Sequence, residues 1–502
     1  MKKRGILLHI TSLPGDFGIG DLGYDAYRFA DYLAKQGYTY WQILPLYHPG
    51  YGNSPYNPVS AFAYNPYLIS PELLYEDGLI DKPDLEAAKL PRNSQVAYDS
   101  VYRNKEQLLQ IATKNYLSTN DITEYIESNA LYLKPYLAYN ILCKLYGDCT
   151  WELYRPEHRH FSEQLYEQLL EEYHSSMLQT ACAQILVQEQ LFRFRSYLRE
   201  KKIILIGDMP LYLSYHSSDV WANQHLFDLD AAGNRLSVAG VPPDAFAEEG
   251  QLWGNPLYRW SEMQADDFRL FQDRIAHALR YLDLLRLDHF IGYVNYWSVP
   301  CPLDPKTGEP TLPLDATAGS WINALGEEFF SVVTNRFGIE PFIAEDLGIL
   351  NEEVCRIRDL FGFPGMIILQ FCFEESVPKV EEYPTERFIY TGTHDNPTAA
   401  EWYAGLAEDS PSRLNFQQFL NENPSLFDAK LLRHKDPGQV VPQLMITIAE
   451  ASGCQRVIIP LQDLLGLGAE ARMNIPGTAL GNWQWRLVDF PGDLSGIDHP
   501  SN

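Results

Sequence analysis

Three carboxylates each follow an apolar run, at three places far apart in the chain. They are Asp288 in LLRLDHF, Glu345 in PFIAEDLG and Asp395 in FIYTGTHDN. Each run has the length of a fully buried strand. In a barrel of parallel strands, the carboxyl ends of all strands open on the face that holds the active site. Three carboxylates that meet there suit the making and breaking of glycosidic bonds.

Asp288 lies two residues after an arginine. Residues i and i+2 of a strand share a face, so Arg286 and Asp288 should point the same way. A neighbouring cation favours the ionised carboxylate, which is the form that a nucleophile needs. A structural arginine–aspartate pair at a strand end would give the same pattern. Asp208, in GDMP, could bond to the Arg286 guanidinium or organise the pocket floor, and its position favours a structural role.

Glu345 is followed directly by a second carboxylate, Asp346. Successive strand residues point to opposite faces, so only one of the two should enter the pocket. A glutamate in a partly apolar site beside other carboxylates has a raised pKa and can serve as a general acid. A glutamate that caps the following helix is the alternative interpretation of Glu345.

The pair His394-Asp395 closes a third run. Its aspartate could accept from one sugar hydroxyl and its histidine donate to the next, with bonds that strengthen in the transition state. Such pairs also occur by chance or as helix caps. The order of the three motifs, RxD then ED then HD on the fourth, fifth and seventh predicted strands of one barrel, is what favours a shared active site.

The elements that must position these residues are eight apolar runs separated by helical patterns. The runs are GILLHI (5–10), YWQILPL (40–46), IILIGDMP (203–210), LLRLDHF (284–290), FIAEDLG (342–348), GMIILQF (365–371), RFIYTGTHD (387–395) and RVIIPLQD (456–463). Continuous apolar runs are typical of parallel strands covered on both faces. The sequence therefore predicts an α/β protein, a (β/α)8 TIM barrel occupying 1–502 as one catalytic domain.

The predicted strands are unevenly spaced, which indicates large insertions after strands two and three. Residues 47–74 are rich in Gly, Pro, Asn and Tyr and should form an irregular loop over the pocket. Residues 75–180 are rich in helix formers and should form a mostly helical inserted subdomain. Residues 211–260, with Pro-Pro and repeated Gly, should form a second irregular loop over the pocket, and we expect its part 241–255 to be mobile on the acceptor side.

The charge and aromatic content limit the possible partners. The formal net charge is −27, which argues against a nucleic-acid or anionic-membrane partner, although solubility alone would explain it. Aromatic residues make up 13% of the chain, enough both to fill a large core and to offer flat faces to sugar rings.

The cysteines and the N-terminus indicate a cytoplasmic protein without a metal site. The seven cysteines have no zinc-ligand spacing, so we expect free thiols in a reducing compartment. The start MKKRGILLHITSLPG has a short apolar run broken by His9, which predicts a strand and not a signal peptide. No run is long enough to span a bilayer.

The motifs together resemble a known family. GDMP (207–210), RLDH (286–289), AEDLG (344–348) and THDN (393–396) resemble four signature regions of the α-amylase clan. More closely, the chain resembles glycoside hydrolase family seventy-seven, the 4-α-glucanotransferases. The resemblance extends from GILLHITSLPG through YGNSPYNPVSAFAYNPYLIS and AGVPPDAFAEEGQLWGNPLYRW to RMNIPGTALGNWQWR.

This resemblance implies a reaction and a role for each carboxylate. An α-1,4-glucan segment would pass from one maltooligosaccharide to the 4-hydroxyl of another glucan or of glucose, without a cofactor or metal. Asp288 would be the nucleophile, Glu345 the acid/base and Asp395 the transition-state stabiliser. Such a retaining reaction expects the two reacting carboxyls about 5–5.5 Å apart.

The resemblance also implies a set of substrate-binding residues. Three would line the donor site, two would lie in the mobile loop over the acceptor side and three would lie near bound glucan. In that order they are Arg286, Asp208 and His394; Trp253 and Asn255; and Tyr56, Ser60 and Asn474.

Two other classes of protein remain as alternatives. A metal-dependent barrel enzyme could use Asp288, Glu345 and Asp346 as Mg²⁺ ligands. One of the adjacent Glu345-Asp346 pair should face away, however, and no lysine is placed as a base. A non-catalytic glucan-binding protein would need only the aromatics, and the complete set of carboxylates argues against it.

Overall fold

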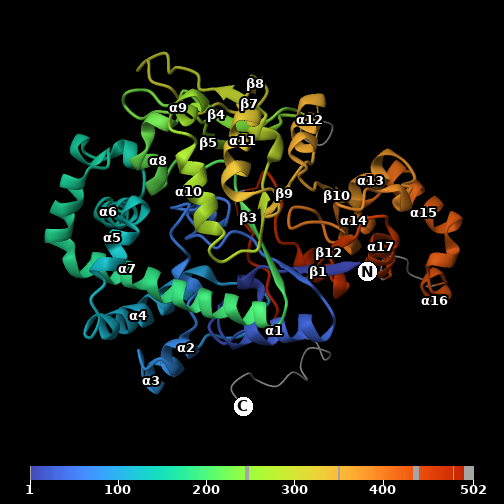
Figure 1. Ribbon diagram of the computed structural model, residues 1–502, viewed down its shortest axis with the longest axis horizontal. Helices are drawn as coiled ribbons and strands as arrows, with labels where there is room; N and C mark the ends of the chain where they lie inside the picture. The colour runs from blue at the N-terminus through green and yellow to red at the C-terminus, as the bar shows by residue number, and fades with distance from the viewer. Residues whose placement is uncertain (1, 244–247, 349–350, 434–439, 479, 491–502) are drawn as a thin grey trace.

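A sheet of eight parallel strands forms the centre of the protein. The computed structural model describes residues 2–243, 248–348, 351–433, 440–478 and 480–490. The strands lie in the order β10-β11-β12-β1-β2-β3-β6-β9 (Figure 1). Their bounds are Lys3–Leu7 (β1), Tyr40–Gln42 (β2), Ile204–Met209 (β3), Leu284–Leu287 (β6), Phe342–Ala344 (β9), Met366–Ile368 (β10), Phe388–Tyr390 (β11) and Arg456–Pro460 (β12). All eight predicted strands are confirmed, and the barrel fold with them.

The strands are buried because helices cover the outer face of the sheet. Ile6, Leu205, Leu285, Ile343 and Ile389, each in a different strand, are fully buried. Full burial of such a side chain stabilises the fold by roughly 1.5–3 kcal/mol. Most of the strands stop before the polar end of the predicted run, because the backbone there turns into the loops that carry the polar side chains.

The helices that surround the barrel follow the spacing of their apolar residues. In α1, Ala26, Phe29, Ala30 and Leu33 are all buried and fall on one face. The helices of this ring are α1 Tyr24–Lys35, α7 Glu163–Glu200, α10 Arg269–Ala278, α11 Gly326–Phe337, α12 Glu352–Phe361, α13 Leu369–Glu375, α14 Ala399–Gly405, α15 Pro411–Glu422, α16 Ala429–Leu432, α17 Val441–Ala451 and α18 Leu461–Leu464.

Helices also occupy most of the long segment between β2 and β3. They are α2 Pro71–Glu76, α3 Lys82–Ala87, α4 Tyr98–Leu117, α5 Thr123–Ser128, α6 Ala130–Tyr146 and the first part of α7. Helix α7 begins where Ser162 accepts a hydrogen bond from the N–H of Leu165, and it continues past residue 180 to reach β3. One helix thus belongs both to the barrel and to the insertion, so the division at residue 180 stays a prediction.

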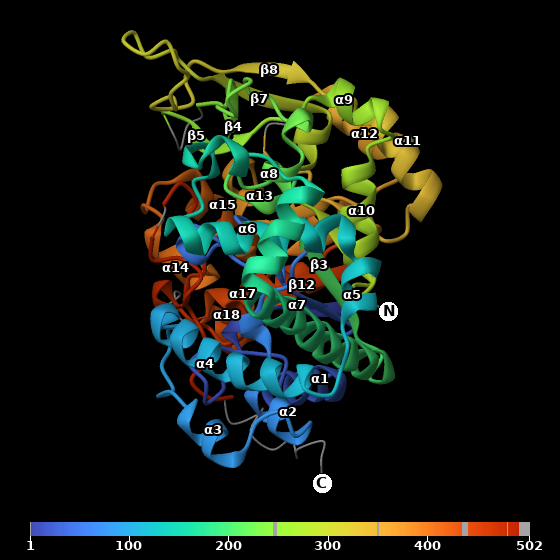
Figure 2. The same ribbon diagram turned by 90° about the vertical axis from the view of Figure 1, so that its left-hand side faces the viewer.

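A second, antiparallel sheet was not predicted. Its order is β5-β4-β7-β8, with bounds Ser237–Val241 (β4), Gln251–Pro256 (β5), Asn295–Pro300 (β7) and Ser320–Asn323 (β8). The expectation of an irregular loop at 211–260 is therefore wrong where this segment forms the strands β4 and β5 and the helix α8 Ser218–Ala222, and α9 Trp260–Ala265 begins at its end. Residues 244–247 of the expected mobile loop lie outside the described residues. The second sheet and the helices α2–α4 lie at opposite ends of the molecule (Figures 1 and 2).

The loop at 47–74 is built from short turns. Its 3₁₀ turns are Tyr51–Asn53 and Pro66–Leu68, and isolated bridges join Tyr47 to Tyr64 and Pro49 to Pro58. The other 3₁₀ turns of the described chain are Ile10–Ser12, Trp151–Leu153, Pro156–His158, Gln224–Leu226, Phe290–Tyr293, Val380–Glu382, Pro424–Leu426 and Ala469–Ala471.

The cysteines differ from expectation at one place. Cys143 and Cys149 form a disulfide, six residues apart, so the prediction of free thiols throughout is wrong there. The C-terminal end of α6 brings the two close together, which their spacing alone did not indicate. In the described ranges, no helix is long and apolar enough to cross a membrane, and no three His, Cys, Asp or Glu residues are grouped to hold a metal ion.

Candidate active site

The ends of β3 and β6 bring together an arginine and two carboxylates. Nη1 of Arg286 donates hydrogen bonds to Oδ2 of Asp208 at 2.6 Å and to Oδ1 of Asp288 at 2.7 Å. The register pairs Asp208 with Arg286 across the two strands. The other terminal nitrogen of Arg286 lies 4.0 Å from Oε2 of Glu345. One buried guanidinium therefore faces three of the predicted site residues.

Glu345 is held by the loop that follows Asp288. The backbone N–H of His289 donates a 2.7 Å hydrogen bond to Oε2 of Glu345. His289 adopts the left-handed conformation, with φ of 50°, so the chain turns sharply just after Asp288. A non-glycine residue in this region costs about 1–2 kcal/mol, and such strain is typical of functional sites.

Burial raises the pKa values of both of these carboxyls. It raises the pKa of Glu345 well above its usual value, against the opposing effect of Arg286, and the nearby Asp288 raises it further. Burial also raises the pKa of Asp288 to about 6, again against Arg286. The expectation that Arg286 would dominate the ionisation of Asp288 is wrong in degree, because desolvation outweighs it. Asp288 is ionised above about pH 6, and burial favours the protonated form of Glu345.

The pKa of Asp395 is lowered, in contrast to those of Asp288 and Glu345. Nδ2 of Asn474 donates a 2.6 Å hydrogen bond to Oδ1 of Asp395, and Nε2 of His394 lies 3.2 Å from Oδ2. Burial acts to raise the pKa of Asp395, but His394 and the Asn474 hydrogen bond outweigh it and lower the pKa to about 2. Arg472 supports this arrangement by donating to the backbone oxygens of Asn474 at 3.0 Å and of Asp395 at 3.4 Å.

Tyr56 links the two halves of the site. Its hydroxyl donates a 2.7 Å hydrogen bond to Oδ2 of Asp208. Its ring stacks on the His394 ring, with centroids 5.1 Å apart and planes at 11°. The Trp483 ring packs 5.6 Å from the Tyr56 ring. The loop after β2 thus touches both the Asp208–Arg286 pair and the His394–Asp395 pair.

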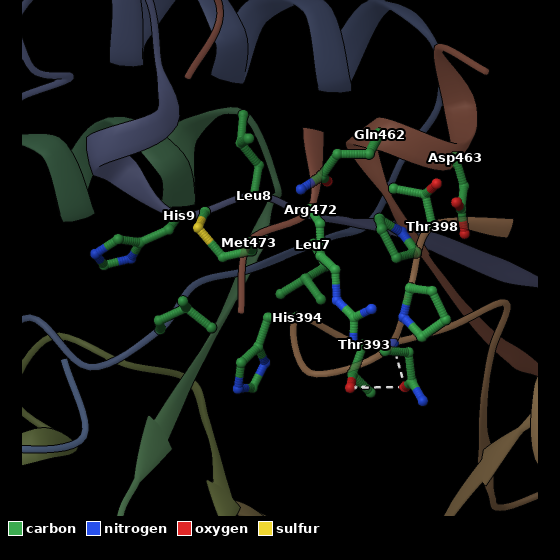
Figure 3. Close-up of a pocket in the computed structure, with 14 residues that line it drawn as sticks. Leu7, Leu8, His9, Thr393, His394, Thr398, Gln462, Asp463, Arg472 and Met473 are labelled. Carbon is green, nitrogen blue, oxygen red and sulfur yellow. Dashed lines mark hydrogen bonds between the residues drawn. The ribbon is translucent and has the colours of Figure 1, made fainter. Parts of the chain in front are cut away.

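A small cavity of about 20 Å³ lies behind His394. Figure 3 shows it between β1, the turn after β11 and the C-terminal segment, with His9, Met473, Thr393 and Asp463 among its lining residues. Thr393 is fixed there by two hydrogen bonds of 2.9 Å from its N–H and hydroxyl to Oδ1 of Asn396. These bonds hold the turn that presents His394.

Trp253, from β5, stands beside the Glu345 end of the site. Its side chain is 38% exposed, and its ring meets the His289 ring edge-on at 4.8 Å. Asn255, two residues further on, donates to the backbone oxygen of Leu213 at 2.9 Å and so supports the loop after β3. Trp253 is therefore the residue of this pair that offers an exposed aromatic face.

Ser60 is not brought together with the other predicted residues. It is fully buried, and its hydroxyl accepts hydrogen bonds from the N–H groups of Phe62 and Ala63, each at 3.2 Å. A side chain in this position shapes the loop and cannot contact a ligand. The burial of Ser60 therefore argues against the position beside a bound glucan that the resemblance implied.

Asp346 points away from the pocket, as the strand alternation predicted. Its carboxylate pairs with Arg358 at 2.6 Å and Arg387 at 3.0 Å. The alternative of an Mg²⁺ site formed by Asp288, Glu345 and Asp346 is therefore wrong, because Asp346 is already bound on the other side of the strand.

Three contributors were missed by the sequence reasoning. His289 acts through its backbone N–H, which no pattern of side chains indicates. Arg472 and Trp483 lie in RMNIPGTALGNWQWR, far along the chain from the strands that they support. The family resemblance included that segment but implied a role only for its Asn474.

Known proteins are similar to this chain over almost their full length. A family model described as 4-alpha-glucanotransferase matches residues 8–490. The 4-alpha-glucanotransferase of Aquifex aeolicus is 38% identical over 493 residues, covering 97% of this chain and 96% of that protein. That of Thermus thermophilus is 36% identical over 509 residues, covering 98% and 95%. The solved amylomaltase from Streptococcus agalactiae in complex with acarbose has a TM-score of 0.88 at 31% identity, covering 99% of this chain and 97% of that one. The chain therefore belongs to the 4-alpha-glucanotransferase family, glycoside hydrolase family seventy-seven.

Proposed function

We propose that this enzyme transfers α-1,4-glucan segments by retaining double displacement, with Asp288 as nucleophile and Glu345 as acid/base. The observation that carries this assignment is the Arg286 guanidinium, which bonds to Asp288 and lies 4.0 Å from Glu345. One buried cation facing both carboxyls supports their action on a single anomeric carbon. Two carboxyl groups about 5–5.5 Å apart would serve this reaction.

The first step needs one carboxyl protonated and the other ionised. Glu345 protonates the glycosidic oxygen while Asp288 attacks the anomeric carbon, and the reducing-end fragment leaves. The pKa of Asp288, about 6, leaves that carboxyl ionised near neutral pH, and the pKa of Glu345, which burial raises well above its usual value, favours the protonated acid. A covalent glucosyl-enzyme with inverted configuration at that carbon results.

The second step restores the configuration. Glu345, now a carboxylate, removes the proton from the 4-hydroxyl of another glucan or of glucose as that oxygen attacks the intermediate. Water would give hydrolysis at the same point. A wall that excludes water favours the sugar, and the half-exposed Trp253 beside His289 is our candidate for that wall.

Asp395 and His394 are assigned to hydroxyl binding on the donor sugar. The low pKa of Asp395, about 2, keeps it an acceptor at every working pH. Hydrogen bonds to ring hydroxyls can strengthen as positive charge develops on the sugar. Asn474 holds Asp395 and Arg286 holds Asp288. Asp208 accepts from both Arg286 and Tyr56, and these four residues complete the donor side.

The substrates are α-1,4-glucans, with maltooligosaccharides as donors and glucose or a glucan as acceptor. The solved relative carries acarbose, an observation that concerns that protein and is compatible with a sugar site here. The net charge of −27 supports the absence of nucleic-acid and anionic-membrane partners. We assign the enzyme to the cytoplasm, where substrates of this kind would be degraded and rebuilt.

Incubation with maltotriose tests the proposed reaction. Transfer yields glucose together with maltopentaose and longer chains, whereas hydrolysis yields only maltose and glucose. Asp288→Asn should lower the rate by at least ~10⁴-fold while glucan binding remains measurable. Full activity in that variant would refute the assignment, and a ladder without longer products would refute transfer.

A further inference from the structure

Between β9 and β10 the barrel closes without a regular strand ladder. These strands are the two ends of the eight-strand order. The N–H of Ala344, the last residue of β9, donates to the backbone oxygen of Pro364 at 2.9 Å. The next N–H on the other side, that of Met366, donates at 2.7 Å to Oδ1 of Asp346. A side-chain carboxylate thus accepts a hydrogen bond that a backbone carbonyl would accept in a regular ladder.

The second carboxylate oxygen of Asp346 contacts arginines from two further segments. Oδ2 accepts from Nη1 of Arg358 on α12 at 2.6 Å and lies 3.0 Å from Nη2 of Arg387, which precedes β11. The Asp346 side chain has no exposed surface. A buried carboxylate that uses both oxygens on three donors is fixed in one orientation.

Gly365 is the residue against which this carboxylate packs. A Cβ added at Gly365 would lie 2.4 Å from Oδ2 and 2.5 Å from Oδ1 of Asp346. Atoms cannot approach so closely, so any side chain here would displace the carboxylate. The position of the Asp346 carboxylate therefore requires a glycine at residue 365.

The backbone of Glu345 is hydrogen-bonded to the neighbouring strand on the opposite side, at the same end of β9. Its N–H donates to the oxygen of Leu287 at 3.1 Å, and its carbonyl accepts from the N–H of Phe290 at 3.2 Å. Both partners belong to β6 and the turn after it. Two successive residues, Glu345 and Asp346, thus connect β9 to its neighbours on both sides.

We infer that Asp346 is a positioning residue for Glu345, because its carboxylate closes the β9–β10 gap and thereby fixes the strand end from which the proton donor projects. This inference rests on the proposed role of Glu345 as the acid. Misplacement of a catalytic group by about 1 Å can cost ~10²-fold in rate. Loss of the Asp346 contacts should therefore affect the step that needs a proton more than a step that does not.

Two variants remove the closure by different routes. Asp346→Asn puts an amide donor or a neutral oxygen against the two guanidinium groups. Gly365→Ala displaces the carboxylate without removing any charge. Asp359→Asn is the matched control, since Asp359 pairs with the same Arg358 at 2.7 Å but is 67% exposed. Thermal unfolding identifies any variant that does not fold.

The readout compares two leaving groups in single-turnover experiments. Glucose release from maltotriose needs protonation of the leaving oxygen, whereas fluoride release from α-maltosyl fluoride needs almost none. We expect folded Asp346→Asn and Gly365→Ala to lose about 100-fold on maltotriose and less than about threefold on the fluoride. Asp359→Asn should stay within about twofold on both.

The outcomes separate this inference from the proposed function. Equal losses on both substrates in the folded variants would mean a general structural role for Asp346 and would overturn the inference. Unchanged rates on maltotriose in Gly365→Ala would overturn it as well. Glu345→Gln serves as the reference: if it shows no preference for the fluoride, the role of Glu345 itself is wrong.

Discussion

The backbone N–H of His289 donates a 2.7 Å hydrogen bond to Oε2 of Glu345. The residue after the proposed nucleophile thus holds the proposed proton donor. The two groups are coupled through a single left-handed residue, so their relative position is set by backbone and not by two independent rotamers. This kind of preorganisation reduces the reorganisation needed during reaction.

The pH dependence of glucan transfer should be bell-shaped. Activity should fall on the acid side with an apparent pKa near 6, because Asp288 must be ionised and burial raises its pKa to about 6. It should fall on the basic side as Glu345 loses its proton, since burial raises the pKa of this carboxyl well above its usual value.

The basic limb can be assigned with one variant. In Glu345→Gln, fluoride release from α-maltosyl fluoride should keep the acid limb and lose the basic limb, since glutamine does not titrate. A basic limb that persists unchanged in this variant would assign it to another group.

Trp253→Ala should shift the balance from transfer towards hydrolysis. Its exposed ring beside His289 offers a stacking face, and such a contact contributes about 0.5–1.5 kcal/mol beyond its buried area. The ratio of transfer to hydrolysis, from the maltotriose product ladder, should fall by about 3- to 10-fold. Trp321→Ala is the control, because Trp321 is similarly exposed, at 42%, but packs on Trp297 and lies in β8, at the opposite edge of the antiparallel sheet from β5. An equal fall in both variants would contradict a specific role.

Asp463 should make the stability of the enzyme depend on pH. This buried carboxyl accepts hydrogen bonds from Ala399 N–H at 2.7 Å and from the Thr391 hydroxyl at 2.5 Å, yet burial raises its pKa to about 6. A raised pKa means that its contribution to stability is fully present below the unfolded-state value and is lost as the pH rises through about 6.

The variant Asp463→Asn removes this dependence while keeping groups that can hydrogen bond. The free energy of unfolding of the variant relative to wild type should therefore increase by about 1–2 kcal/mol between pH 5 and pH 8. Urea unfolding at the two pH values measures it, with the exposed Asp409→Asn as control. A difference that stays constant with pH would contradict the assignment.

The barrel could be predicted from sequence because its strands are covered on both faces. Runs such as IILIGDMP and LLRLDHF are mostly apolar, and the polar residues towards the end of each run mark the open face. The alternation of Glu345 and Asp346 followed from strand geometry alone. What each member of that pair contacts could not be predicted, since Arg358 and Arg387 come from other elements.

The antiparallel sheet was missed because its strands look like loops. SVAGV contains a glycine and QLWGNP a glycine and a proline, which weaken any strand pattern, and the other partner of β4 is β7, far along the chain. The pKa of Asp288 was misjudged for a related reason. Its Arg286 neighbour is visible in the sequence, whereas the burial that outweighs it arises only when the barrel is formed.

The identity of the attacking carboxylate is the central claim, and trapping the intermediate tests it most directly. Glu345→Gln should still react with α-maltosyl fluoride but lack the base for the second step, so a glycosyl-enzyme should accumulate in the absence of acceptor. Proteolysis and tandem mass spectrometry then locate the sugar. We predict a maltosyl ester on Asp288. A sugar attached to Asp395 or to another side chain, or inverted product without any adduct, would contradict the account.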